Sequence, residues 1–272
     1  MRPICLLLPL LALAACQQAA PPAAAPSTAA LAAPQPAPLP PAAPAAAARK
    51  MSESNDLYDF EYGYPAAAAA IPPLRDWLEA DLAKAKADLI SSANDARAEA
   101  KGSDFPYNAY MASSEWQVVT DLPGWLSLSA QNYSFEGGAH GNSWPQALLW
   151  DKTASNGSGQ RRTALDLFTS GAALKAAVLK PFCAQLTRER AKKREGQEIG
   201  DPSDEFNQCI DPLEQVVILG SKSAKGFDRI GFLIAPYNAG PYVEGSYEVT
   251  LPVTSAVLAA VKPEYRAAFA LP

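Results

Sequence analysis

The stretch EWQVVTDLPGWLSLSAQNYSF, residues 115–135, decides the fold class, because apolar and polar residues alternate on both sides of Leu122-Pro123-Gly124. An alternation of period two is typical of half-buried strands, and a Pro-Gly pair between two such runs is typical of a hairpin turn. The segment therefore predicts two adjacent antiparallel strands, around residues 115–120 and over residues 125–135.

A strand and a long helix are expected before this hairpin. The aromatic run LYDFEYGYP, residues 57–65, predicts the strand. Pro72-Pro73 then opens a segment in which apolar residues recur at helical spacing: Leu74, Trp77, Leu78, Leu82 and Leu89. This spacing predicts one amphipathic helix that ends near Gly102.

The elements expected after the hairpin are grouped and do not alternate regularly. WPQALLWD, residues 144–151, predicts a third strand, and a second long helix follows over residues 172–194. Three short strands (215–219, 229–234 and 246–251) and a short helix (255–260) complete the chain. We therefore expect an α+β fold, a mainly antiparallel sheet with two long helices packed on it, with room for two small lobes.

The N-terminus predicts an exported protein. Arg2 precedes the apolar run 6–13, which is a secretory signal and too short to span a bilayer. The signal peptide is expected over residues 1–15, and Leu13-Ala14-Ala15-Cys16 resembles a bacterial lipobox in which Cys16 is the lipid attachment site. An ordinary signal peptide is the alternative. Residues 16–50, nearly all Ala and Pro after Cys16, are then a tether.

The charge balance excludes one class of partner. The chain has 23 Lys and Arg against 28 Asp and Glu, a net charge of −5. Nucleic-acid binding requires clustered positive charge, so we expect no nucleic-acid partner. The one basic cluster, residues 188–194, includes Glu189 and is followed by Glu195, which predicts a solvated helix face.

The few cysteines and the single histidine restrict the chemistry. Of the four cysteines, Cys5 lies in the predicted signal peptide and Cys16 is the predicted lipid attachment site, which leaves Cys183 and Cys209. Two thiols in an oxidising compartment are expected to form a disulfide. With one histidine and no C-x-x-C, a four-ligand zinc site cannot be assembled from Cys and His. We expect no metal and no cofactor.

Two loops contain the candidate contact residues. In SFEGGAHGN, residues 134–142, Gly138 and Gly141 flank His140 and predict a tight connection. A structural role for His140 is favoured there, with partner contact and catalysis as alternatives. In APYNAGPYVEG, residues 235–245, Tyr237 and Tyr242 are expected to pack, or to contact a partner.

Three landmarks in this order, YSFEGGAHGN, ALDLF and FLIAPYNAGPYVEGSYEVTLP, resemble the paired PdaC-type and RsiV-type domains of peptidoglycan deacetylase PdaC and of the lysozyme-sensing anti-sigma factor RsiV. The resemblance implies a PdaC-type part over residues 51–170, an RsiV-type part over residues 171–272, and an extracytoplasmic setting. It does not imply one shared chemistry. Metal-dependent deacetylation would need a metal-binding aspartate and two histidines, whereas this chain has one histidine.

Two functional hypotheses follow. The favoured one is a non-catalytic, lipid-anchored cell-envelope domain that binds a protein or glycan partner; a lysozyme-type enzyme or peptidoglycan is the candidate that the resemblance implies. The alternative is a cell-wall hydrolase with a carboxylate pair that the sequence does not identify, which leaves enzymatic activity open. Gln17, in place of an aspartate that would retain a lipoprotein in the inner membrane, favours the outer membrane of a Gram-negative cell, with the domain facing the periplasm.

Overall fold

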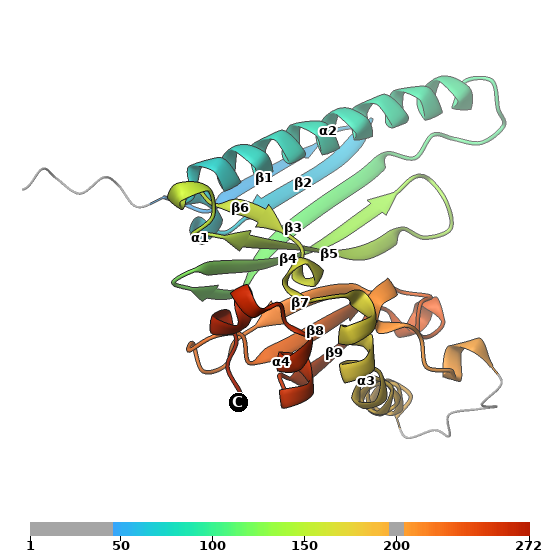
Figure 1. Cartoon of the computed structure of the whole chain (residues 1–272). Coiled ribbons are helices and arrows are strands. Elements are labelled where there is room, and N and C mark those ends of the chain that lie inside the picture. Colours follow the sequence, from blue (N-terminus) through green and yellow to red (C-terminus); the bar gives the residue numbers. More distant parts are fainter. Residues whose placement is uncertain (1–45, 196–203) are drawn as a thin grey trace, which may run out of the picture. The chain divides into compact units, whose positions relative to one another are not determined.

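Nine strands form two sheets in the part of the chain that the structure describes, residues 46–195 and 204–272 (Figure 1). In this computed structural model the larger sheet has the order β1-β2-β3-β4-β5-β6 and the smaller one the order β7-β8-β9. All described residues lie in the compact unit Pro44–Pro272. The predicted signal peptide, Cys16 and residues 16–45 of the predicted tether lie outside the described residues.

The larger sheet contains β1 (Arg49–Ser54), β2 (Tyr58–Tyr64), β3 (Tyr110–Leu122), β4 (Trp125–Phe135), β5 (Asn142–Asp151) and β6 (Gln160–Arg162). The smaller sheet contains β7 (Val216–Gly220), β8 (Arg229–Ile234) and β9 (Tyr247–Pro252). The helices are α1 (Ala66–Ala69), α2 (Pro72–Ala100), α3 (Gly171–Lys193) and α4 (Ser255–Ala260), and the 3-10 turns used below are η3 (Glu205–Asn207), η5 (Tyr242–Glu244) and η6 (Pro263–Ala268). The predicted α+β fold, with mainly antiparallel strands and two long helices, is confirmed.

Helix α2 explains the one parallel pair of strands. β2 and β3 run parallel with Phe60 opposite Ala112, whereas the other paired strands of both sheets are antiparallel. Parallel neighbours need a long crossover, and α2 supplies it. The helix begins at Pro72, where a missing N–H costs nothing, and it buries Leu74, Leu78 and Leu82 against the sheet.

Tyrosines of β2 join this sheet to α2 through paired polar groups. Tyr58, Phe60, Tyr62 and Tyr64 alternate along the strand and are buried. The Tyr62 hydroxyl donates to Asp81 Oδ2 of α2 (2.8 Å) and accepts from the indole nitrogen of Trp116 (3.0 Å). Burial and the Asp81 carboxylate both raise the pKa of Tyr62, so the hydroxyl stays protonated and can donate. The Tyr62 hydroxyl is therefore fully hydrogen-bonded although its ring is buried between β2 and α2.

The smaller sheet has its own core and a covalent cross-link. Helix α3 buries Leu174, Val178, Phe182 and Leu186 against the strands. The predicted disulfide between Cys183 and Cys209 is confirmed, with 5.3 Å between the two Cα atoms. It ties the middle of α3 to the segment after η3.

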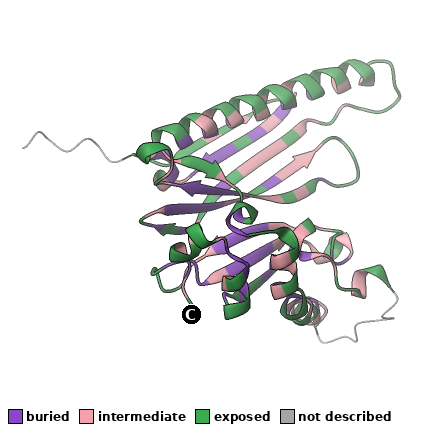
Figure 2. Ribbon diagram, in the orientation of Figure 1, coloured by how far each residue is buried: buried purple, intermediate pink, exposed green. Residues whose placement is uncertain are grey.

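The β3–β4 hairpin contributes to both cores. Leu126 and Leu128 pack in the cluster under α2, whereas Leu122 and Trp125 pack in the cluster of the smaller sheet. Figure 2 shows buried residues along strands of both sheets and exposed residues along the outer side of α2. The loops that leave β4 and β8 therefore start from strands that are buried in the two cores.

Two predicted boundaries can be compared with these elements. Strand β1 includes Arg49 and Lys50, the last two residues of the predicted tether. The division between residues 170 and 171 falls at the start of α3, where the Ser170 side chain accepts a hydrogen bond from the backbone N–H of Ala173. The assignment of the two parts to separate domains remains a prediction.

Candidate functional site

The structure brings the predicted contact residues of the two loops together. His140 lies in the β4–β5 loop, and Tyr237 and Tyr242 lie in the β8–β9 loop. The rings of His140 and Tyr242 stack with centroids 3.9 Å apart, and the hydroxyl of Tyr237 is 3.3 Å from Nε2 of His140. Together with Val243, which is 90% exposed, these three residues form what we call the aromatic patch.

The hydrogen bonds of His140 define its tautomer. Nδ1 is 2.9 Å from the carbonyl oxygen of Gly141, which can only accept, so Nδ1 carries the proton. In the neutral imidazole Nε2 is then an acceptor and receives the hydroxyl of Tyr237. The Tyr242 hydroxyl donates to the same Gly141 carbonyl at 2.7 Å, so the two loops share one acceptor.

The glycines of the β4–β5 loop differ in why the fold requires them. Gly137 has a φ of +78°, a left-handed conformation that favours glycine. A Cβ at Gly141 would lie 2.3 Å from the Tyr133 ring, so a side chain at this position would require that ring to move. Gly138 has neither constraint, because its φ is not positive and the nearest atom to an added Cβ is 4.0 Å away.

A residue near the C-terminus of α3 binds the backbone of the β8–β9 loop. Arg190 is 1% exposed, and its Nε donates to the Ala239 carbonyl at 2.8 Å. Its Nη1 donates to the carbonyls of Gln208 (2.9 Å) and Asn207 (3.2 Å). The prediction of a solvated helix face over residues 188–194 is therefore wrong at Arg190. The charge is buried because three backbone carbonyls from distant segments surround it.

A second charged contact, only partly exposed to solvent, fixes the far end of the same loop. Arg194 and Glu244 form an ion pair at 2.7 Å with side chains only 14% and 13% exposed, and the Tyr247 hydroxyl also donates to Glu244. Burial raises the pKa of Glu244, but the hydrogen bonds from Arg194 and Tyr247 and the nearby positive charges outweigh it and lower the pKa. Lys193 donates to the Glu244 carbonyl at 2.5 Å. These contacts hold η5 against α3.

The loop holds Tyr237 in a strained conformation. Its φ is +70°, and its side chain is 51% exposed. A bulky residue in the left-handed region costs about 1–3 kcal/mol and persists only where the surrounding structure imposes it, and such outliers cluster at functional sites. The contacts of Arg190, Arg194 and His140 impose it here. The aromatic patch is thus an exposed surface on a rigid support.

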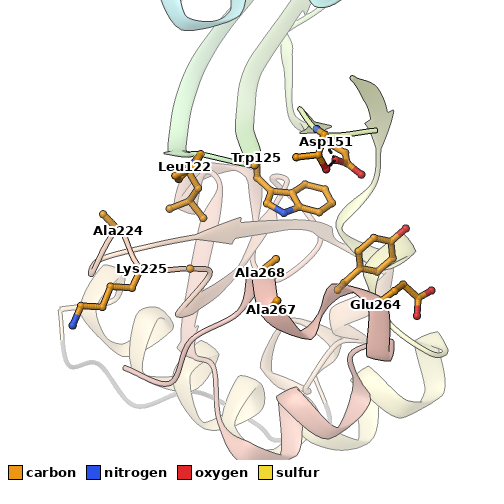
Figure 3. Close-up of a pocket in the computed structure, with 13 residues that line it drawn as sticks. Leu122, Trp125, Asp151, Ala224, Lys225, Glu264, Ala267 and Ala268 are labelled. Carbon is orange, nitrogen blue, oxygen red and sulfur yellow. Dashed lines mark hydrogen bonds between the residues drawn. The ribbon is translucent and has the colours of Figure 1, made fainter. Parts of the chain in front are cut away.

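A cavity with a volume of about 450 Å³ lies elsewhere, beside the turn of the β3–β4 hairpin (Figure 3). Trp125 lines it, with Asp151 from β5 and Glu264 from η6. Asp151 Oδ1 accepts hydrogen bonds from the backbone N–H groups of Thr153 and Ala154, both at 3.1 Å, and from the Thr153 hydroxyl, while Oδ2 accepts from Arg162. This carboxylate is occupied in holding a turn, which argues against a role in the predicted acid pair.

The N-terminal part of the described chain is similar to a known family. Residues 51–143 match the family described as Deacetylase PdaC. The predicted PdaC-type resemblance is therefore confirmed over these residues, which include the last four residues of β1, all of β2, β3 and β4, and the loop with His140. No other conclusion about chemistry follows, because the function of this domain family is uncertain.

Two solved structures with DUF3298 in their descriptions resemble the chain. One, from Pseudomonas aeruginosa, is 16% identical, with a TM-score of 0.49 over 79% of this chain and 94% of that one. The other, from Bacteroides fragilis, is 16% identical, with a TM-score of 0.46 over 75% of this chain and 88% of that one. The comparison with curated proteins gives no match. The RsiV-type resemblance of residues 171–272 stays a prediction.

Within residues 46–195 and 204–272, no helix is long and apolar enough to cross a membrane. In the same ranges, no three His, Cys, Asp or Glu side chains are grouped so that they could hold a metal ion.

Arg190→Lys should loosen the β8–β9 loop. Lysine keeps the charge but lacks the planar fork, so it cannot bond the Ala239 and Gln208 carbonyls together. We expect a loss of about 1–3 kcal/mol in the free energy of unfolding, measured by urea denaturation. Arg188→Lys is the matched control, because exposed Arg188 bonds only the side chain of Gln185. Equal stability of the two variants would contradict the role assigned to Arg190.

The Glu244 ion pair predicts a pH dependence. The folded-state pKa lies below the ordinary value of about 4.3, so the stabilisation is present above that value and is lost as the pH falls through the folded pKa. Glu244→Gln should therefore be less stable than the wild type at pH 7, and the difference should shrink towards pH 3. Urea unfolding of both proteins across this range measures it. A difference that stays constant would show that Glu244 is not ionised in the pair.

Proposed function

We propose that this protein is a non-catalytic binding module of the cell envelope that contacts its partner through the aromatic patch. The observation behind the proposal is the strained and half-exposed Tyr237 on a loop that Arg190, which is buried, and Arg194 hold in place. A preorganised loop loses little conformational entropy on binding, and tyrosines supply large contact area with few rotatable bonds. A protein that used this loop only for packing would gain nothing from exposing these side chains.

The partner of this proposal is a protein or a glycan, and the candidate that the resemblance to PdaC-type and RsiV-type domains implies is a lysozyme-type enzyme or peptidoglycan. Both fit the patch in chemical terms. Tyrosines and a histidine can enter a cleft of a protein, and their rings can also stack on the apolar faces of sugars. We favour binding over the hydrolase alternative because Asp151, an acid that lines the cavity beside the β3–β4 turn, is occupied by the hydrogen bonds of a turn.

The anchor belongs to the same proposal. Cys16 lies outside the described residues, and its lipidation is inferred from the lipobox-like sequence alone. A lipid at Cys16 and the Ala/Pro-rich tether would hold the module at a membrane surface, in the outer membrane facing the periplasm of a Gram-negative cell.

Tyr237→Gly separates binding from folding. Glycine adopts a positive φ without strain, so the free energy of unfolding should stay the same or rise. Loss of the ring should weaken partner binding by about 1 kcal/mol or more, roughly fivefold or more in Kd. The measurement pairs thermal unfolding with calorimetric titration of lysozyme and of soluble peptidoglycan fragments, using the full chain.

Three outcomes of that titration would count against the proposal. Unchanged affinity in Tyr237→Gly would remove the patch from the interface, and absence of binding to both ligands would remove both candidate partners. Turnover of wall fragments that disappears in His140→Ala would show an enzyme. Leu271→Ala, which trims an exposed apolar side chain at the C-terminus, is the control.

Cys16→Ser tests the anchor. The variant should leave the membrane fraction of its native host or remain unprocessed, because serine cannot take the thioether-linked lipid. Fractionation and mass spectrometry of the N-terminal peptide measure both. A soluble wild-type protein with an unmodified Cys16 would disprove the lipoprotein assignment.

A further inference from the structure

A second small cavity adjoins the loop that contains His140. It has a volume of about 270 Å³ and lies where the C-terminus of α2, the α2–β3 loop and the β4–β5 loop meet. Figure 1 shows these two loops at the same end of the larger sheet. Gly137 belongs to this cavity and to the His140 loop, so the cavity and the aromatic patch flank the same segment.

The walls of this cavity are aromatic. Phe105 is 80% exposed at the tip of the α2–β3 loop. Tyr107 and Tyr110 stack with ring centroids 5.9 Å apart, and the Tyr107 hydroxyl donates to the Leu57 carbonyl at 2.5 Å. The Ser103 hydroxyl accepts from the Phe105 N–H at 3.3 Å and so fixes the bend of the loop. The rings of Tyr107 and Tyr110 are therefore held in place before any ligand arrives, whereas the Phe105 ring is exposed.

The charges in the cavity are negative. Glu99 and Glu136 line it, and neither carboxylate forms an ion pair or hydrogen bond with another described residue. Burial, followed by the charge of Glu136, raises the pKa of Tyr110, and Glu99 adds to the rise. Ala96 and Ala100 also line the cavity, so the negative end of the 29-residue helix α2 faces it.

Two positively charged side chains lie close to the cavity, but neither is among the residues that line it. Arg97 donates to Asp56 at 2.7 Å, and its guanidinium lies 5.8 Å from the centroid of the Tyr107 ring. Lys101 is exposed in the α2–β3 loop and does not line the cavity. Two carboxylates, a helix C-terminus and exposed aromatic rings are therefore combined without a cation among the lining residues.

We propose that this cavity binds a lysine or arginine side chain of a protein partner. A cation over aromatic faces is attracted by the ring quadrupoles, and the two carboxylates and the helix C-terminus add to that attraction. The volume accommodates one long side chain with its charged group. The partner class is thus a protein with a basic residue next to the surface that meets the aromatic patch.

This assignment rests on the proposed function in one respect, namely that the basic residue lies next to the partner surface that meets the aromatic patch. Binding of a cation in the cavity can be tested without that partner. The probe is Nα-acetyl-lysine amide, with Nα-acetyl-norleucine amide as the uncharged analogue of similar length. Titrations of the isotope-labelled full chain are followed by the amide resonances of Phe105, Tyr107 and Gly137. We expect saturable shifts with the lysine probe, with a Kd on the order of 1–10 mM, and much smaller shifts with norleucine.

Glu99→Gln/Glu136→Gln should weaken binding of the lysine probe by at least about fivefold, because both carboxylates lose their charge. The control is Glu214→Gln/Glu264→Gln, which removes two charges from exposed side chains outside the cavity and should leave the affinity unchanged. Equal shifts with both probes would show an apolar site, and unaltered affinity in the Glu99/Glu136 variant would show that these acids do not bind the cation. Either result overturns the assignment and leaves the Tyr237→Gly experiment unaffected.

Discussion

The two-sided burial of the β3–β4 hairpin is the constraint on which the rest of the structure depends. Successive side chains of a strand point to opposite faces, so Leu126 and Leu128 pack under α2 while Trp125 packs with Phe227 in the second core. A one-residue shift in register would exchange these two sets and leave both cores unfilled. The hairpin thus holds the two sheets, and the loops that leave them, in one arrangement.

Buried charge fixes the loops more finely than apolar packing can. Apolar contacts are not directional, whereas the Arg190 guanidinium has donors at fixed angles and bonds carbonyls of the β8–β9 loop and of the segment after η3. The disulfide at Cys209 restrains the same segment one residue further along. The strain at Tyr237 persists because these contacts leave the loop no relaxed alternative.

Local periodicity explains what could be predicted from the sequence. Helix α2, strand β4 and the short helix 255–260 were all expected close to their observed bounds, since each has a clear apolar pattern. Strands β1 and β6 have no such pattern, because an exposed edge strand buries little. The burial of Arg190 and the contact between His140 and Tyr237 depend on residues 49 and 97 positions away, which no local pattern can reveal.

The candidate site residues show the same difference between features with a local sequence pattern and features that depend on distant residues. Glycines and aromatics indicate both loops in the sequence, because a Gly-rich turn and a run of Pro, Gly and Tyr are recognisable there, but no local pattern predicts that the two loops touch. The acidic cavity was not indicated, since Glu99 ends a helix and Glu136 begins a loop, and only the parallel return of β3 beside β2 brings them to one wall. The long crossover that this parallel pair requires therefore also places the C-terminus of α2, with its negative dipole end, beside the loop that contains His140.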